Sequence, residues 1–597
     1  MFRSICFSLC VALLVAIHLT GLGLSQAQAD TGTAGGSTTL VGPGLVTRIV
    51  IPASPTPPDK FAAQELSTYL QKITGQSIQV VSSNETVTGD ASSPVIVLGM
   101  HPMNVDLEAG KLAEDAFVID VAPGVMRIAG HYAGPSQKPG EAVKYRHNRG
   151  TLNGVYTFLD HQGVRWYNPK PYGEHVPQKE TITAPLGRQQ QTPAYRYRMG
   201  GTIYRWFPDQ TDEQWDMVKL WDRRNRINRF YGGKTNPQLV ESFGGSYSIP
   251  THHNIHNYFP ASLYEKHPEY FAMINGERPK PGRHYQPCVS NVEVQQLVIK
   301  NILKQLRSAG HPKDADVAIS LEPSDGNDYC ECENCRALDD PDLKARNGAI
   351  KNLGGASMSN RVIYFCNQIL DGVNKEYPNA RAGILAYLSH SEPPTKFKPH
   401  KNLIIAPTTM GAAYSDQSKF LDDPDSKGNR NFKELLEGWG QHSPIVTREY
   451  FSGGTWYGPI PTLHVLQDRF KRYREFNVQG IVNEVHPSWG PQGVMHYFLV
   501  RVQWNPDIDL KKELREYCDN MYGPGGEAMY NYFMTMEEKS LAGPNYFFSA
   551  RFIDRLFVQE GVLEAMTPHI MEAKRLIGDQ QPYAQRLAGD LAGYEVA

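Results

Sequence analysis

The stretch ADVAISLEPSDGNDYCECENC, residues 315–335, joins a short apolar strand to a turn rich in acidic residues. The predicted strand is Asp316–Leu321, and Glu322, Asp325 and Asp328 follow it within one tight turn. In (β/α)8 barrels the catalytic groups sit at the carboxyl ends of the strands. The pattern therefore indicates a barrel strand whose end carries functional acids, although an Asp-Gly turn with solvated carboxylates would look the same.

Strand and helix patterns alternate on both sides of this stretch. The clearest helical pattern is Val294–Leu306, which has one apolar face and Ser290 or Asn291 as its N-cap. Eight strands separated mostly by helices predict an α/β fold with a (β/α)8 TIM barrel at residues 189–504. The predicted strands are Tyr195–Met199, Ile227–Tyr231, Gly245–Ile249, Asp316–Leu321, Arg381–Ala386, Asn402–Ala406, Ile445–Glu449 and Gln479–Asn483.

Residues 41–188 predict a small α/β domain in front of the barrel. A strand at Thr47–Ile51 precedes an amphipathic helix that Asp59 opens and Gly75 closes. A hairpin around Pro123-Gly124 and a second helix at Thr151–His161 follow. Beyond the barrel, residues 505–597 have helical patterns and predict a helical C-terminal region.

The N-terminus has the plan of a secretory signal peptide at residues 1–29. Arg3 supplies a positive charge, Cys10–Ile17 is apolar, and Ala27-Gln-Ala29 offers a small-residue cleavage site. We expect export to the periplasm or the cell exterior, a flexible leader at 30–40, and no transmembrane segment in the mature chain. The net charge of −2 from balanced acids and bases argues against a nucleic-acid partner and leaves the oligomeric state open.

Acids at the predicted strand ends fit glycoside hydrolysis. That reaction needs one carboxyl group to protonate the leaving oxygen and a second to attack or to activate water. Glu322 or Asp325 is the candidate acid, and Glu484 after the last strand or Glu449 after the seventh is the candidate base or nucleophile. Arg448 could instead simply neutralise its neighbour Glu449.

A second set of residues near the strand ends could bind a carbohydrate substrate. Clustered histidines after the third strand can hydrogen-bond sugar hydroxyls or bind a metal ion, and we favour sugar binding. Trp489 could stack on a sugar ring or serve as a packing residue. The candidate substrate-binding residues are His252, His253, His256, Asp328, Tyr387, His486 and Trp489.

Four cysteines form a separate group. Cys330, Cys332 and Cys335 have metal-ligand spacing, and Cys288 could complete a tetrahedral structural zinc site. Two disulfides are the alternative in an oxidising compartment. Either arrangement would clamp the loop that carries the acids, and neither is a cofactor for catalysis.

Four segments of the N-terminal part resemble, in order and spacing, the α/β domain that precedes the barrel in β-hexosaminidases and α-glucuronidases. They are Ala62-Ala-Gln-Glu-Leu-Ser-Thr-Tyr-Leu-Gln-Lys-Ile-Thr-Gly75, Val95-Ile-Val-Leu-Gly99, Gly150-Thr-Leu-Asn-Gly-Val-Tyr-Thr-Phe-Leu159 and Gly163-Val-Arg-Trp-Tyr167. In those families this domain supports the barrel, so the resemblance implies no catalytic residue before about residue 190.

Later motifs resemble the secreted bacterial family called domain of unknown function 4838. They are His267-Pro-Glu-Tyr-Phe271, Asn275-Gly-Glu-Arg278, Cys288-Val-Ser-Asn291, Ser324-Asp-Gly with the cysteine group, Trp504-Asn-Pro-Asp507 and Tyr522-Gly523. The family's layout, similar to that of β-hexosaminidases and α-glucuronidases, implies sugar hydrolysis. The Asp-Glu pair that hexosaminidases carry after strand four is not reproduced, because Glu322 and Asp325 are three residues apart.

The hypothesis from the sequence is therefore an exported glycoside hydrolase that acts on a polysaccharide or oligosaccharide. Two alternatives remain. A non-catalytic glycan-binding protein on the same scaffold would have aromatic residues but no convergent acid pair. A metal-dependent hydrolase would bring His252, His253 or His256 to a carboxylate at metal-binding distance.

Overall fold

The computed structural model describes residues 35–131, 149–200, 211–230, 236–410, 418–451, 458–484, 488–543 and 555–596. The predicted signal peptide and His486 lie outside the described residues. The predicted leader does not extend to residue 40, since β1 (Ser37–Val41) pairs with β9 (Ile182–Pro185) in an antiparallel sheet. Leu40 and Val41 are fully buried there, so two apolar residues at the end of a Gly- and Thr-rich segment suffice to anchor it.

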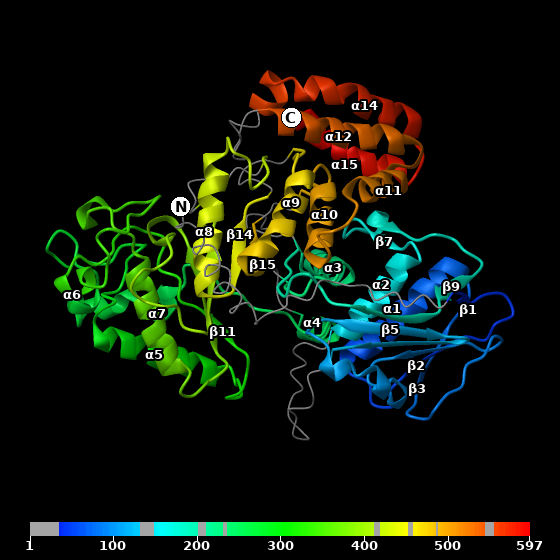
Figure 1. Cartoon of the computed structure of the whole chain (residues 1–597), viewed down its shortest axis with the longest axis horizontal. Helices are drawn as coiled ribbons and strands as arrows, with labels where there is room; N and C mark the ends of the chain where they lie inside the picture. Colours follow the sequence, from blue (N-terminus) through cyan, green and yellow to red (C-terminus); the bar gives the residue numbers. More distant parts are fainter. Residues whose placement is uncertain are drawn as a thin grey trace, which may run out of the picture.

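A six-stranded mixed sheet forms the N-terminal part, shown in blue and cyan in Figure 1. Helices α1 (Pro57–Thr74) and α2 (Gly150–His161) pack against each other and against the sheet. Thr56 caps α1 through its side chain, and Gly75 ends it in the left-handed region at φ 76°. In spatial order the strands are β10 (Gly187–Gln191), β5 (Phe117–Ala122), β6 (Val125–Gly130), β4 (Val95–Leu98), β2 (Arg48–Ile51) and β3 (Gln79–Ser82).

A five-stranded parallel sheet lies at the centre of the molecule (Figure 1). Its strands are β11 (Ala318–Ser320), β12 (Arg381–Ala386), β13 (Leu403–Pro407), β14 (Ile445–Glu449) and β15 (Val478–Asn483). The helices between and around them are α5 (Val292–Ser308), α6 (Glu333–Arg336), α7 (Ser359–Val373), α8 (Lys427–His442), α9 (Leu463–Tyr473) and α10 (Gly493–Trp504). These strands coincide with the last five that the sequence predicts.

Both faces of this sheet are covered. Ile384, Ile405 and Ile445 belong to a large cluster shared with the helices. Leu385 and Val446, one position along their strands, belong to a second cluster on the opposite face. This alternation follows from the two-residue period of a strand and explains why the strands are apolar throughout.

The first three predicted strands are irregular. The first two make isolated parallel bridges, Tyr197 with Gly480 and Met199 with Arg229, while beyond the third His253 bridges to Glu322. Side chains replace part of the regular ladder: the Arg198 N–H donates to Asn228 Oδ1 at 2.9 Å, and Asn228 Nδ2 donates to the Arg196 carbonyl at 2.7 Å. The apolar pattern located these segments, whereas competition from side chains for backbone groups could not be predicted from it.

Two further helices and a small hairpin adjoin the N-terminal part, since Trp166 and Trp221 belong to its core and α4 contacts α1. They are α3 (Asp212–Arg224), α4 (Pro237–Ser242) and the pair β7 (Arg165–Trp166) and β8 (Glu174–His175). The C-terminal helices gather at one end of the molecule, in orange and red in Figure 1, around an aromatic- and methionine-rich core of their own. They are α11 (Leu510–Tyr522), α12 (Gly526–Ala542), α14 (Val562–Ile577) and α15 (Tyr583–Val596). Within the described ranges, no helix combines the length and the hydropathy that crossing a membrane requires.

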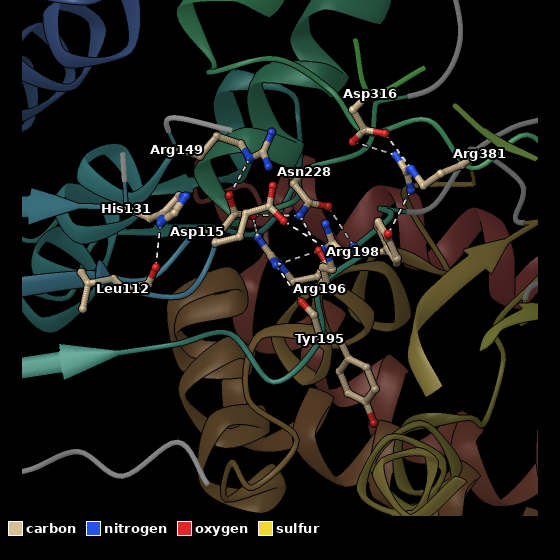
Figure 2. Close-up of polar contacts among 12 residues, drawn as sticks. Leu112, Asp115, His131, Arg149, Tyr195, Arg196, Arg198, Asn228, Asp316 and Arg381 are labelled. Atoms are coloured by element: carbon tan, nitrogen blue, oxygen red, sulfur yellow. Dashed lines mark hydrogen bonds and ion pairs between the residues drawn. The ribbon is translucent and has the colours of Figure 1, made fainter. Parts of the chain in front are cut away.

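Asp115 connects the N-terminal sheet to the central part (Figure 2). Its carboxylate accepts hydrogen bonds from Arg149 Nε at 2.8 Å, Arg198 Nη2 at 2.6 Å and Asn228 Nδ2 at 2.8 Å, and all four residues are buried. Burial alone would raise the pKa of Asp115, but Arg149, Arg198 and Arg223 together hold it well below its usual range. A buried carboxylate with several cationic donors is strongly favoured in its ionised form.

Candidate functional site

Glu322 follows β11 with only Leu321 between them, and its carboxylate is completely buried. Its Oε2 accepts a hydrogen bond from the backbone N–H of Leu385 at 2.6 Å, at the point where β11 and β12 separate. Its Oε1 lies 3.0 Å from His390 Nε2 and 3.6 Å from His253 Nδ1. The side chain is therefore held by partners from three chain segments, as a buried carboxylate must be to offset its desolvation.

The sequence interpretation missed His390. This residue lies in the short turn after β12, and its Nδ1 is 3.2 Å from the hydroxyl of buried Tyr329. Leu388, two residues earlier, has a φ of 44°, which a leucine rarely adopts and which costs about 1–3 kcal/mol. The available signal was its position, because Tyr387-Leu-Ser-His390 follows β12 directly, but a single histidine there attracts less notice than the cluster after residue 251.

His253 lies between Glu322 and the turn acid Asp325. Its Nδ1 is 2.8 Å from the carbonyl oxygen of Pro323, so this nitrogen donates and Nε2 faces the carboxylate of Asp325 at 3.8 Å. Half of the Asp325 side chain is exposed, at 52%, whereas that of Glu322 is inaccessible. The ring of Tyr387 is 5.8 Å from that of His253, centroid to centroid. An imidazole, an exposed acid and a buried acid thus converge at the carboxyl end of β11.

A second polar group occupies the carboxyl ends of β14 and β15. Arg448 and Glu484 form an ion pair, and their side chains are only 10% and 11% exposed. Arg448 Nη1 also lies 3.5 Å from Thr251 Oγ1, one residue before His252. Burial, followed by the charges of Arg448 and Arg229, lowers the pKa of His252 to about 4. The His252-His253 pair therefore lies between the two strand ends that carry acids. His253 is the neighbour of Glu322 and Asp325, and His252 is the neighbour of Arg448.

Glu449 points to the opposite side of β14 from Arg448. It is fully buried between the sheet and α9, where it accepts a hydrogen bond from Tyr473 and lies 3.8 Å from Arg469. This placement satisfies the carboxylate inside the protein, on the helix-covered side of the sheet. It follows from the strand period, because the neighbours Arg448 and Glu449 must face opposite ways.

The other predicted binding residues are more dispersed. Trp489 is half-buried, and its ring makes an edge contact with Trp221 at 4.7 Å and a tilted contact with His496 at 4.5 Å, centroid to centroid. Its environment is the core of the N-terminal part, against which it packs. His256 and Asp328 are exposed, and His486 lies outside the described residues.

The four predicted cysteines come together. The sulfur atoms of Cys288, Cys330, Cys332 and Cys335 all lie within 4.8 Å of one another, and none is in a disulfide. Among the described residues, this is the single group of three or more His, Cys, Asp or Glu side chains whose ligand atoms are gathered closely enough to hold a metal ion.

Solved structures with similar folds include glycoside hydrolases. A family GH115 4-O-methyl-α-glucuronidase with specificity for decorated arabinogalactans is 13% identical, with a TM-score of 0.53 over 92% of this chain and 71% of that one. A family 89 glycoside hydrolase from Clostridium perfringens in complex with PUGNAc is 12% identical, with a TM-score of 0.53 over 90% of this chain and 60% of that one. At such identities the likeness shows the fold alone. The comparison with curated proteins gives no match.

A family model described as domain of unknown function (DUF4838) matches residues 166–535. The matched segment spans the central sheet, both polar groups at its strand ends and the four cysteines, and it amounts to more than half of the chain. The resemblance drawn from the sequence motifs is thus confirmed, and the chain belongs to the DUF4838 family.

Proposed function

We propose that this protein is an exported glycoside hydrolase that cleaves a polysaccharide or oligosaccharide with a pair of carboxyl groups. One observation carries the proposal: His253 lies within 3.8 Å of the carboxylates of both Glu322 and Asp325 at the end of a parallel strand. Such convergence of titratable groups at the carboxyl ends of parallel strands is typical of catalytic sites. The glycoside-hydrolase fold of the similar structures supports the same class of reaction.

We infer that the central sheet closes into a (β/α)8 barrel, with residues 189–504 as the catalytic domain. The five regular strands supply one side. The three irregular segments supply the other, because Tyr197 bridges to Gly480 in β15 and His253 bridges to Glu322 after β11. Met199 and Arg229 join two of these segments, and the Tyr247 N–H donates to the Asn228 carbonyl at 2.9 Å. The small α/β domain at 41–188 and the helices after 505 would then support the barrel.

Asp325 is the candidate general acid in this proposal, since it is accessible and has an imidazole beside it. Glu322 is too deeply buried to touch a substrate, and its role is to position His253 and His390. Glu484 is the candidate base or nucleophile, for which Arg448 supplies the opposite charge. Glu449 is inaccessible to a sugar and holds Tyr473 and Arg469 in place.

His252 and Tyr387 are candidate contacts to sugar hydroxyls. A pKa of about 4 keeps His252 neutral at physiological pH, so one ring nitrogen can donate and the other can accept. Tyr387 is half-buried beside His253 and presents a ring with a hydroxyl group. This combination of a neutral imidazole and an aromatic ring with a hydroxyl group suits a substrate that has both apolar C–H faces and hydroxyl groups.

Hydrolysis of a panel of polysaccharides and aryl glycosides, including uronides and N-acetylhexosaminides, tests the proposal. The purified mature protein should turn over at least one substrate, while Asp325→Asn and Glu484→Gln should lose most of that activity with folding intact. Asp342→Asn is the matched control, because Asp342 is exposed and belongs to neither of the two polar groups at the strand ends. Full activity in both site variants would contradict the assignments, and glycan binding without turnover would favour a non-catalytic glycan-binding protein.

The intact mass of the exported protein tests whether the predicted signal peptide is cleaved after Ala29.

A further inference from the structure

We propose that Cys288, Cys330, Cys332 and Cys335 bind one structural zinc ion as a tetrahedral set of four thiolates. This inference concerns a site separate from the proposed sugar-cleaving acids and stands without them. It decides between the two arrangements that the cysteine spacing leaves open.

The distances between the sulfur atoms fit a zinc ion. Zinc binds thiolate sulfur at about 2.3 Å, which places the sulfurs of a regular tetrahedron about 3.8 Å apart. Cys288 Sγ lies 3.7 Å from Cys332 Sγ and 3.8 Å from Cys335 Sγ. All four sulfurs lie within 4.8 Å of one another, so each has the other three as neighbours.

Two disulfides would produce a different geometry. Each bridge would bring two sulfurs to about 2.05 Å and leave the two bridges as separate pairs. Instead, Cys288 is about equally distant from two partners, as it would be at one corner of a tetrahedron. The chain thus gathers the thiols around a common point rather than joining them two by two.

Hydrogen-bond donors and a cation surround the sulfurs. The Met273 N–H donates to Cys330 Sγ at 3.3 Å, and Ser290 Oγ lies 3.1 Å from Cys335 Sγ. Arg278 interacts electrostatically with Cys288, Cys330 and Cys332. Four thiolates around Zn²⁺ have a net charge of −2, which such N–H donors and a nearby guanidinium stabilise.

The local backbone presents the ligands from two segments. Cys332 is the N-cap of the short helix α6, whose first turn carries Cys335. Cys288 comes from a strand-like segment whose N–H donates to the Tyr270 carbonyl at 2.8 Å. An ion at this point would cross-link segments more than 40 residues apart in sequence and fix a region that has little regular secondary structure.

The same cross-link would fix the surroundings of Glu322. The carbonyl of Cys330 accepts a hydrogen bond from buried Arg361 at 2.7 Å, and adjacent Tyr329 reaches His390. Because protein thiolates would fill all four positions, the ion would have no open site for a substrate or water. The zinc is therefore structural, and its loss should loosen Tyr329 and His390 rather than remove a reacting group.

Metal analysis of the purified full-length mature protein is the direct test. We expect about one zinc per chain by mass spectrometry of the metal content. Cys332→Ser and Cys335→Ser should each lower that content at least tenfold, and Cys366→Ser should keep it, because Cys366 is buried in α7 outside the cluster. Replacement of the metal by Co²⁺ in the unaltered protein should give the intense absorption of tetrahedral cobalt thiolate, a readout that does not depend on how the variants fold.

Thiol labelling separates zinc from the alternatives. After denaturation with a chelator and no reductant, the zinc site predicts that all four cysteines react with an alkylating reagent. Absence of zinc with these cysteines blocked from alkylation would overturn the proposal in favour of two disulfides. Absence of zinc with four reactive thiols, or failure of Co²⁺ to give the thiolate spectrum, would also overturn it.

Discussion

His390 Nε2 lies 3.0 Å from Glu322 Oε1, although the two residues are 68 positions apart in the chain. Both side chains are at least 95% buried, so the contact is shielded from water. His390 thereby links the acid at the end of β11 to Tyr329, which precedes the first cysteine of the CxCxxC segment.

Replacing His390 should destabilise the protein. In His390→Ala the buried Oε1 of Glu322 loses its closest side-chain donor, which should lower the free energy of unfolding by about 1–3 kcal/mol. Urea unfolding measures this change. His284→Gln, at an exposed histidine, should stay within about 0.5 kcal/mol of the unaltered protein. Equal stability of the two variants would show that the contact contributes nothing.

Asp115→Asn should cost about 3–5 kcal/mol, because Asn keeps the shape but leaves the positive charges of Arg149 and Arg198 uncompensated inside the protein. The pKa of Asp115 is lower in the folded protein than in the unfolded chain, where it is near 3.8, so the ionised carboxyl stabilises the fold above that pH. This stabilisation is lost as the pH falls further. Denaturant unfolding at pH 7 checks the magnitude, with Asp342→Asn as the exposed control. A loss below about 1 kcal/mol would contradict the role of Asp115 as a required counterion.

Asp590 should make stability fall with rising pH. Burial raises the pKa of this carboxyl to about 7, while the Tyr522 hydroxyl donates to it at 2.8 Å. Between pH 4 and pH 7 the unfolded chain ionises Asp590 and the folded chain does not, which costs about 1.4 kcal/mol per pH unit. Thermal unfolding across this range should therefore show a smaller decline for Asp590→Asn than for the unaltered protein. Asp579→Asn, exposed in the same C-terminal region, should reproduce the unaltered decline.

His252 should have the opposite effect from Asp590 on the pH dependence of stability. Its folded pKa of about 4 lies below the ordinary 6.5, so between pH 6.5 and pH 4 only the unfolded chain takes up the proton. Stability should decrease as the pH falls through this window, by up to about 3 kcal/mol. His252→Gln should remove that part of the pH dependence in unfolding experiments, whereas His284→Gln should retain it. Parallel curves for His252→Gln and the unaltered protein would refute the prediction.

Sequence patterns predicted much of the scaffold, because burial imposes a regular period on it. The last five strands and α1, α2 and α5 could be located from apolar spacing and capping residues such as Gly75 and Asn291, although α1 begins at Pro57, after Thr56, and not at the predicted Asp59. The acids after β11 and β15 could be found by their position after a strand. The irregular segments near Tyr197 and Arg229 could not be predicted as such, since side chains there substitute for backbone hydrogen bonds.

The candidate site was harder to predict, because its residues are distinguished by the direction in which their side chains point and not by their position relative to a strand end. Glu449 ends β14 and Glu484 follows β15, yet the first faces the helices and the second pairs with Arg448. The pleat of β14 sends Arg448 and Glu449 to opposite faces, and a shift of one residue in the predicted strand would exchange their directions. His390 was missed because the chemistry sought was a carboxylate pair, and the partner that holds a carboxylate is seldom close to it in sequence.

The position of Asp115 limits how this architecture could have been assembled. Arg198 and Arg223 lie in the segment predicted to form the barrel, but the carboxylate that neutralises them comes from the N-terminal sheet. A gene fragment beginning at residue 189 would inherit buried positive charges without their counterion. The central part therefore cannot be moved alone into another protein. A recombination event that joined it to a different domain would have to supply an acid at the position of Asp115, or Arg198 and Arg223 would have to be replaced first.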